Sequence, residues 1–167
     1  MSTPPDSARD TFEVAELHLR PMTEPEFDEY LPHTISNHAD SHLAAGSWSK
    51  EEAEQRAAAD AANLLPAGLA TENMLFYMAE AGDGEIVGWV WLCLRSPLAW
   101  IFDIEVVADQ RGKGYGRALL DAAEAELRSR GIPAVALQVF GPNVAAQRLY
   151  ATSGYQLISQ QMRKELS

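Results

Sequence analysis

The stretch Arg111-Gly-Lys-Gly-Tyr-Gly-Arg117 carries the strongest fold signal in this 167-residue chain. It lies between an extended apolar segment, Leu98 to Val107, and a strongly helical one. Glycine lets the backbone approach a phosphate closely because it has no Cβ. The first N–H groups of a helix also attract anions, with help from the helix dipole. The stretch therefore predicts a strand, a tight anion-binding turn and a helix, with a phosphorylated cofactor as the ligand.

Two better-known phosphate motifs do not fit this stretch. A Walker loop ends in Gly-Lys-Ser/Thr, whereas Gly112-Lys113 is followed here by Gly114. A dinucleotide fingerprint needs a glycine where Arg117 stands and an acid near the end of the next strand. The next expected strand, Ala134–Phe140, contains no acid. The pattern that remains is Arg-x-x-Gly-x-Gly.

Length and composition are those of an ordinary globular chain, with 47% hydrophobic and 22% charged residues. We expect a disordered N-terminus over residues 1–10 and one domain over residues 11–167. No run approaches the roughly 18–20 apolar residues of a membrane span. The first ten residues also lack the apolar core of a signal peptide. A cytoplasmic protein without membrane contact fits these features best.

The net charge of −11 is unevenly distributed. Residues 1–70 hold 13 acids and 4 bases, giving −9, whereas residues 71–167 hold 11 acids and 9 bases, giving −2. A nucleic acid partner is therefore not expected, because phosphate neutralisation needs basic patches. The acidic first half suits a cationic substrate through electrostatic steering. The same excess also serves solubility, and both interpretations stand.

The hydrophobic pattern predicts an α/β fold, with a mixed sheet and helices on both faces. Strands are expected at Phe12–Arg20, Met74–Ala81, Glu85–Arg95, Leu98–Val107, Ala134–Phe140 and Tyr155–Lys164. A helix should begin at Thr23 and end or kink near Tyr30, because Pro32 follows. Further helices are expected at Ile35–Ala45, from Ser49 to Leu65, after the glycine stretch with Leu119, Ala123 and Leu127 on one face, and at Asn143–Thr152.

With these residues in place, the chain resembles the GCN5-related N-acetyltransferases, the GNAT superfamily. The resemblance covers nearly the whole chain and is most specific across residues 101–156. It is carried by Ile101–Val107, Arg111–Gly116, Val139–Asn143, Ala146–Tyr150 and Ser153–Tyr155. The helical first seventy residues resemble a bacterial subgroup whose substrates are mostly unassigned.

The resemblance implies a central mixed sheet of six to seven strands, splayed at a cleft that binds acetyl-CoA. The cleft would lie between the strands Leu98–Val107 and Ala134–Phe140. Cofactor-binding residues would be Val106, Val107, Arg111, Gly112, Lys113, Gly114, Tyr115, Gly116, Arg117 and Asn143. Tyr150 would point at the cofactor sulfur. One departure is Ala108, where many members have proline.

Amine acetylation also needs a group that removes a proton from the acceptor. Asp103 and Glu105 are the candidates, on the strand beside the cleft, and they share a face if the strand is regular. A solvated or ion-paired strand edge is an equally good interpretation of both carboxylates. Tyr150 could instead fill the core, and Asn143 could cap its helix. The histidine pair at positions 38 and 42 lacks a convincing third ligand, so no metal is expected.

The sequence thus predicts an acyltransferase that moves an acetyl group from acetyl-CoA to a primary amine of a small molecule or peptide. The amine would attack directly within a ternary complex, and a cationic acceptor is favoured. The alternative is a non-catalytic acyl-CoA-binding module that acts as a sensor or interaction partner. A donor with an acyl chain longer than acetyl is a further possibility, and a homodimer is compatible with the sequence.

Overall fold

The computed structural model describes residues 16–95 and 97–167. The expected disorder of residues 1–10 lies outside these ranges. The chain forms two compact units. Unit 1 contains the described residues up to Thr23 together with Asn73–Val135, and unit 2 contains Glu24–Glu72 and Ala136–Ser167. The expectation of one domain over residues 11–167 stays a prediction.

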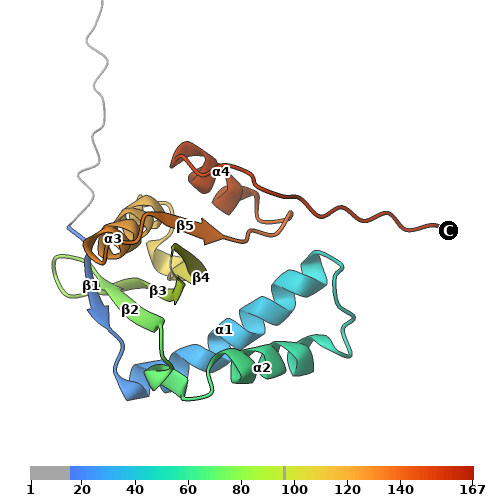
Figure 1. Ribbon diagram of the computed structural model, residues 1–167, viewed down its shortest axis with the longest axis horizontal. Helices are drawn as coiled ribbons and strands as arrows, with labels where there is room; N and C mark the ends of the chain where they lie inside the picture. The colour runs from blue at the N-terminus through green and yellow to red at the C-terminus, as the bar shows by residue number, and fades with distance from the viewer. Residues whose placement is uncertain (1–15, 96) are drawn as a thin grey trace, which may run out of the picture. The chain divides into compact units, whose positions relative to one another are not determined.

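A five-stranded sheet, ordered β1-β2-β3-β4-β5, forms the framework of unit 1 (Figure 1). Its strands are β1 (His18–Pro21), β2 (Met74–Glu80), β3 (Ile86–Arg95), β4 (Leu98–Val106) and β5 (Ala134–Leu137). Strand β5 continues from unit 1 into the first residues of unit 2. The α/β class predicted from the sequence is confirmed.

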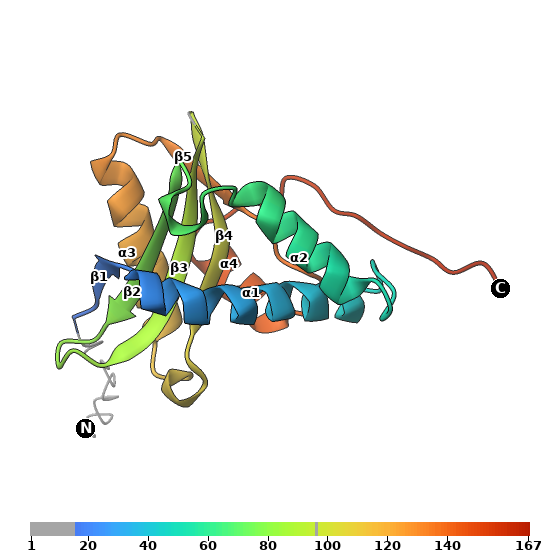
Figure 2. The ribbon, with the colours of Figure 1, turned by 90° about the horizontal axis from the view of Figure 1, so that it is seen from below.

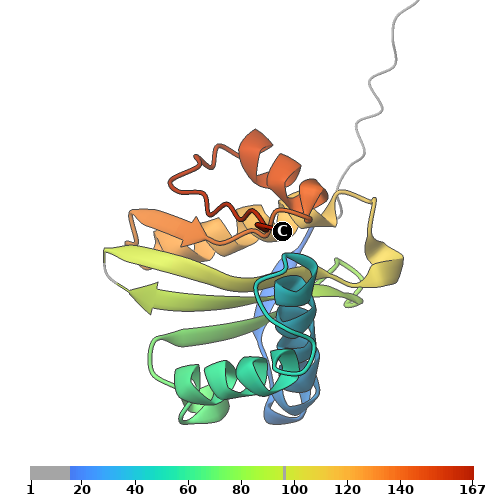
Figure 3. The ribbon, with the colours of Figure 1, turned by 90° about the vertical axis from the view of Figure 1, so that its right-hand side faces the viewer.

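The strands β2, β3 and β4 lie side by side as antiparallel neighbours (Figure 3). Trp91 pairs with Asp103, but Leu92 pairs with Ile101, so Phe102 is an extra residue in β4. Such a β-bulge would place the two candidate carboxylates on different faces if it lay between them. It falls before Asp103, and the pairing is regular from there to Val106.

Helix α3 (Tyr115–Ser129) packs against β3 and β4. Its buried side chains are Leu119, Leu120, Ala123 and Leu127, which confirms the predicted apolar face. Gly88 of β3 permits the close approach of these elements. A Cβ at position 88 would lie 2.2 Å from the carbonyl oxygen of Glu105 and 3.2 Å from a methyl carbon of Leu119.

A polar network also joins α3 to β2. The Tyr77 hydroxyl donates to a Glu126 oxygen at 2.9 Å, and Arg130 donates to the same carboxylate at 2.7 Å. Burial raises the pKa of Tyr77, and the hydrogen bond to Glu126 raises it further. The hydrogen bond from Arg130 lowers the pKa of Glu126. The network therefore favours an ionised glutamate and a protonated tyrosine.

Unit 2 is built around two packed helices, α1 (Glu24–Ala44) and α2 (Ala53–Leu64) (Figure 2). Helix α2 turns small residues inward at every fourth position, namely Ala53, Ala57 and Ala61. Ala39 of α1 packs with the first two of these alanines. Ile35, Leu43 and Trp48 pack around these small residues.

Helix α1 runs unbroken through Pro32, so the two helices expected at Thr23–Tyr30 and Ile35–Ala45 are one. Proline removes the N–H that would bond to the Asp28 carbonyl. Asp28 and Pro32 are both exposed, so water can satisfy that carbonyl. The buried side chains of Tyr30 and Thr34, on either side of the proline, hold the helix in place.

An aromatic cluster closes the end of α1 against the loop that follows it. The His42 ring stacks on Trp48 with centroids 3.7 Å apart, and Phe140 meets His42 edge-on at 4.8 Å. His38 lies 4.6 Å from His42. Burial lowers the pKa of His42, His38 lowers it further, and Asp60 acts in the opposite direction. The cluster therefore favours a neutral His42 in unit 2.

Two other sequence expectations differ from the structure. Helix α2 begins at Ala53 rather than Ser49, because residues 49–52 form a turn in which the Ser49 hydroxyl donates to Glu52 at 3.1 Å. The expectation of six to seven strands is wrong, since the described residues form five. Residues 155–164 follow α4 (Val144–Thr152) without forming a strand. A strand needs a neighbour to bond with, and a strand-like sequence does not supply one.

We expect Gly88→Ala to lower the free energy of unfolding by about 3 kcal/mol, because the new methyl group would overlap the Glu105 carbonyl. Urea unfolding followed by circular dichroism measures the change. Gly82→Ala is the matched control, since a Cβ there meets its nearest atom at 3.9 Å. Equal stability of the two variants would contradict the close approach of β3 and β4.

Candidate active site

The glycine stretch forms a turn between a short 3₁₀ helix, η2 (Ala108–Gln110), and α3. Gly112 and Gly114 adopt left-handed backbone angles, with φ of 75° and 86°. The first i→i−4 bond of α3 runs from the Ala118 N–H to the Gly114 carbonyl at 3.3 Å. The N–H groups of Tyr115 and Gly116 come before that bond in the chain. The first N–H groups of any helix have no acceptor within the helix itself. The predicted arrangement of strand, turn and helix is therefore present.

The buried side chain of Gln110 links the turn to Glu85, the residue before β3. It is 6% exposed, and its side-chain amide donates to Glu85 at 2.7 Å. Its amide oxygen accepts from the Lys113 ammonium at 3.0 Å. Sequence reasoning missed this role, because a glutamine beside a turn ordinarily signals an exposed position. The Lys113 ammonium is thus positioned by the uncharged amide of Gln110.

Arg111 is tied back to the end of β4. Its Nε donates to the Val106 carbonyl at 3.1 Å, and its terminal nitrogen lies 3.2 Å from a Glu105 carboxylate oxygen. The Arg111 side chain is 60% exposed, whereas that of Glu105 is 19% exposed. An ion pair this open to solvent is weak and easily exchanged for another partner.

The two candidate carboxylates share one face of β4. Asp103 pairs with Trp91 and Glu105 with Trp89, in a stretch without a register shift. Gly88 faces α3, so alternation turns Trp89 and both acids to the opposite face. The Trp89 indole donates to Asp103 at 3.2 Å. Each carboxylate thus has a hydrogen-bonding partner, Trp89 for Asp103 and Arg111 for Glu105.

The backbone at Val106 and Val107 is engaged within unit 1. The Val107 N–H donates to the Val87 carbonyl at 2.9 Å, and the Val107 carbonyl accepts from Gln110 at 3.0 Å. A cofactor arm that paired with the Val107 N–H would have to displace Val87. The Val106 carbonyl accepts a hydrogen bond from the exposed Arg111 side chain. The assignment of both residues to a cofactor stays a prediction.

Asn143 and Tyr150 belong to unit 2, where they lie at the start and in the last turns of α4. The Asn143 side-chain oxygen accepts from the Ala146 N–H at 3.1 Å, so the predicted helix cap is confirmed. Tyr150 packs beside Tyr155, with ring centroids 5.6 Å apart. Gln147 donates to the carbonyls of Phe140 and Gly141, which fixes the turn before Asn143.

Within residues 16–95 and 97–167, no group of three or more His, Cys, Asp or Glu side chains is placed to hold a metal ion. In the same ranges, no helix has the length and hydropathy needed to cross a membrane. The donor set around the turn consists of cationic side chains and helix N–H groups. That set suits an anion.

Comparison with known families agrees with this geometry. The model of the acetyltransferase (GNAT) family matches residues 13–155. The chain belongs to this family and is an acyltransferase. The match includes the glycine turn, β4 and the whole of α4.

The relatives include proteins of matching length and longer ones. The "uncharacterized N-acetyltransferase YycN" of Bacillus subtilis is 34% identical over 154 residues, covering 90% of this chain and 99% of the relative. The crystal structure of YycN superposes with a TM-score of 0.88 at 33% identity, over 90% of this chain and 99% of that one. A mycothiol acetyltransferase of Thermobispora bispora is 35% identical over 68% of this chain, but only 38% of the relative is covered.

The solved structures with the same fold include one in complex with coenzyme A. The PaiA N-acetyltransferase of Thermoplasma acidophilum, solved in complex with coenzyme A, has a TM-score of 0.64. It is 19% identical, over 87% of this chain and 92% of that one. At this identity the likeness establishes the fold alone.

Proposed function

We propose that this chain transfers an acetyl group from acetyl-CoA to a primary amine of a small molecule or peptide, by direct attack within a ternary complex. The observation that carries the proposal is the turn at Arg111–Arg117, which presents left-handed glycines, cations and a helix start in a chain of the GNAT family. Acetyl-CoA, when bound, supplies a thioester carbonyl that the amine attacks and a thiolate that leaves.

The turn fits a pyrophosphate by its own chemistry. A Cβ placed on Gly112 meets nothing within 4 Å, so the space above this residue is open to a ligand. The N–H groups at the start of α3 and the helix dipole favour an anion there. Arg111, Lys113 and Arg117 add charge. In the proposed complex, Asn143 of unit 2 caps its helix and also hydrogen-bonds the cofactor arm.

Arg111 gives the proposed site a way to respond to its ligand. In the structure the guanidinium holds both the Val106 carbonyl and the Glu105 carboxylate. An anion at the turn would compete for this exposed side chain, because it too can accept charge-assisted hydrogen bonds from the guanidinium. Rotation of Arg111 toward the anion would break its hydrogen bond to the Val106 carbonyl and its ion pair with Glu105, which would make both groups more available to the bound cofactor and the amine.

A base is needed because amines are protonated at neutral pH. A lysine-like amine has a pKa near 10.4, so removing its proton at pH 7 costs about 4–5 kcal/mol. We assign proton removal to Glu105, directly or through one water, because an exposed and exchangeable arginine is among its partners. Asp103 is the second candidate, and its bond from the Trp89 indole makes it the less available one.

Tyr150 is assigned to the leaving thiolate. A thiol pKa near 8.5 lies below a tyrosine pKa near 10, so complete proton transfer from Tyr150 would be uphill by about 2 kcal/mol. A hydrogen bond that strengthens as negative charge develops on sulfur avoids that cost. Tyr150 therefore acts in this proposal as a hydrogen-bond donor to the sulfur.

Charge favours a cationic acceptor. Residues 24–72, which form α1 and α2, contain ten acids and two bases. An acidic surface raises the local concentration of a cationic amine and speeds its encounter with the enzyme. A panel of primary amines that differ in charge, at low and high salt, would reveal this steering as a salt-sensitive preference for polycations.

Release of the free thiol of coenzyme A, measured across that amine panel, tests the whole proposal. Amine-dependent release with stoichiometric acetylated product is the expected result. Tight binding of acetyl-CoA without turnover on any amine would instead favour the non-catalytic acyl-CoA-binding module. Competition between acyl-CoA chains of different length would identify a donor larger than acetyl.

We expect Gly112→Ala to weaken coenzyme A binding at least tenfold, because the methyl group occupies space that the pyrophosphate needs. Isothermal titration calorimetry measures the dissociation constant. Gly131→Ala is a matched control, since φ is 73° there against 75° at Gly112 and both positions are open for 4 Å. Both variants should lose about 1–2 kcal/mol of stability from backbone strain. Unchanged coenzyme A affinity in Gly112→Ala would refute the pyrophosphate assignment.

Tyr150→Phe should lower kcat about 10²-fold while leaving the dissociation constant of acetyl-CoA within twofold of the wild-type value. The lost hydrogen bond stabilises charge that exists only as the thiolate departs. Steady-state kinetics and calorimetry separate the two quantities. Tyr155→Phe, which removes a hydroxyl from the neighbouring ring, should keep kcat within threefold. Parallel losses of turnover and affinity would assign Tyr150 to binding instead.

Glu105→Gln should reduce kcat/KM by about 10²-fold or more near pH 7, and the deficit should shrink as pH approaches the pKa of the amine. Asp103→Asn should lose less. Glu124→Gln is the control for removal of a carboxylate, because Glu124 is also ion-paired with an arginine and is 17% exposed. A larger deficit in Asp103→Asn would move the role of base to Asp103.

A further inference from the structure

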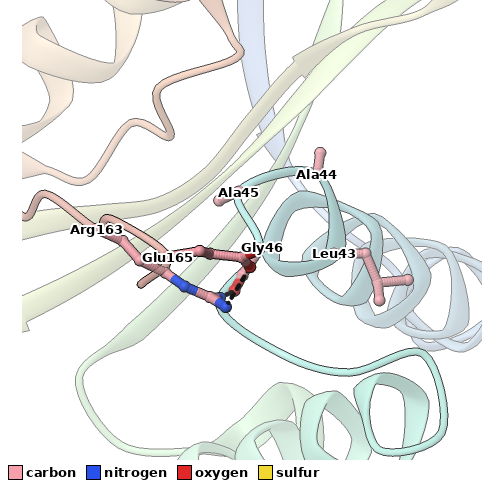
Figure 4. Close-up of a pocket in the computed structure, with 6 residues that line it drawn as sticks. All are labelled: Leu43, Ala44, Ala45, Gly46, Arg163 and Glu165. Carbon is pink, nitrogen blue, oxygen red and sulfur yellow. Dashed lines mark hydrogen bonds and ion pairs between the residues drawn. The ribbon is translucent and has the colours of Figure 1, made fainter. Parts of the chain in front are cut away.

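Lys113 departs from the way in which this acidic chain usually holds its cations. In the described ranges, ion pairs with carboxylates are formed by Arg20, Arg56, Arg111, Arg128, Arg130 and Arg163. Figure 4 shows one of them, in which Arg163 lies 2.9 Å from Glu165. The Lys113 ammonium donates instead to the amide oxygen of Gln110 at 3.0 Å. In a chain with 24 acids and 13 bases, an uncharged partner for this cation needs a physical reason.

The orientation of the Gln110 amide is determined by its neighbours. Its nitrogen donates to a Glu85 carboxylate oxygen at 2.7 Å, and its oxygen accepts from Lys113. A carboxylate can only accept and an ammonium can only donate, so a flipped amide would oppose like groups at both ends. A buried amide also needs these partners to satisfy its polar atoms. Glu85 thus fixes the direction in which Gln110 presents its oxygen to Lys113.

The two backbone positions behind this contact are themselves held. The Glu85 N–H donates to the Asp83 side chain at 3.0 Å, and the Glu85 carbonyl accepts from the Ala81 N–H at 2.8 Å, in the turn between β2 and β3. The Gln110 N–H donates to the Val107 carbonyl at 3.0 Å, in η2. A chain of hydrogen bonds within unit 1 therefore runs from the β2–β3 turn through Gln110 to the glycine turn.

An uncharged support leaves the charge of Lys113 available to an anion. A carboxylate in the place of Gln110 would neutralise the ammonium with a hydrogen bond about twice as strong as one to a neutral group. The ammonium has three N–H donors, so it can keep its bond to Gln110 and still donate to a phosphate. Because the long lysine side chain is already ordered, it loses less rotamer freedom when the anion binds.

We propose that Gln110 is a positioning residue of the donor site. Held by Glu85, it orders the Lys113 ammonium at the glycine turn for a phosphate of coenzyme A without neutralising it. Because coenzyme A is taken as the ligand of the turn, this role rests on the proposed function. The β2–β3 turn thereby contributes to donor binding although neither Glu85 nor Gln110 touches the ligand.

A double-mutant cycle tests whether Gln110 acts through Lys113. Calorimetry with coenzyme A should give a dissociation constant about three- to tenfold higher for Gln110→Met and about tenfold higher for Lys113→Met. The double variant should bind within twofold of Lys113→Met, because the support has no further effect once the ammonium is gone. Independent, multiplying losses in the two single variants would overturn the proposal.

Arg128→Met is the control for the loss of one positive charge. Arg128 lies in the last turn of α3, about 20 Å along the helix from the glycine turn. This variant should bind coenzyme A within twofold of the wild type. Urea unfolding followed by circular dichroism reports whether every variant is folded.

Glu85→Met tests the other end of the chain of hydrogen bonds without changing a buried residue, since Glu85 is exposed. Charge alone predicts tighter coenzyme A binding, because an acid close to the anion is removed. Loss of the group that orients Gln110 predicts the opposite, a dissociation constant about two- to fivefold higher. Glu85→Gln, which still offers an oxygen acceptor, should bind at least as tightly as the wild type. Unchanged or tighter binding by Glu85→Met would overturn the proposal.

The wild-type titration separates this proposal from the proposed function. A wild type that does not bind coenzyme A would overturn both. Wild-type binding together with multiplying losses in the cycle would overturn the role of Gln110 alone. Where acetyl transfer is observed, the loss in Gln110→Met should fall on the KM for acetyl-CoA rather than on kcat, since a phosphate holds Lys113 once the donor is bound. A loss confined to kcat would also overturn the positioning role.

Discussion

The close contact between β3 and β4 at Gly88 is the constraint on which unit 1 depends. With only a hydrogen at position 88, the Glu105 carbonyl and a Leu119 methyl group both approach the β3 backbone. This contact fixes how α3 packs on the sheet and which face of β4 carries the two acids. The chain then leaves β4 at Val106 and reaches the turn at Arg111 through the short helix η2. A proposed donor site and a proposed base are therefore positioned by one glycine.

The features predicted from sequence are those that local patterns determine. The positions of strands β2, β3, β4 and β5, the apolar face of α3, the turn at Gly112 and the Asn143 cap were all readable from residue type and spacing. Strand β4 was predicted, but the position of its bulge at Phe102 was not, because that position depends on how a partner strand pairs. The predicted end or kink of the helix before Pro32 was wrong for a similar reason. The rule that proline interrupts a helix does not consider the packing of Tyr30 and Thr34.

The candidate site shows the same division. Its candidate residues were proposed from the sequence, but their hydrogen-bonding partners were not. Nothing in the sequence indicated that Arg111 would hold Glu105 and Val106 together or that buried Gln110 would carry Lys113. Those contacts depend on side chains that meet only after the strand, the 3₁₀ helix and the turn have formed. They change the proposal, because they make the base and the cofactor-binding carbonyl conditional on where Arg111 points.

The aromatic cluster around His42 links the stability of unit 2 to acidity. Because burial lowers the pKa of His42 below 6.5, the unfolded chain binds that proton more tightly than the folded chain does. The contribution of this residue is therefore complete above about pH 6.5 and declines as the pH falls toward the lowered value. Protonation would place a cation against the ring of Trp48 and beside His38. In mild acid, proton uptake by His42 therefore lowers the free energy of unfolding, and the affected contacts are those between α1 and the loop that carries Trp48.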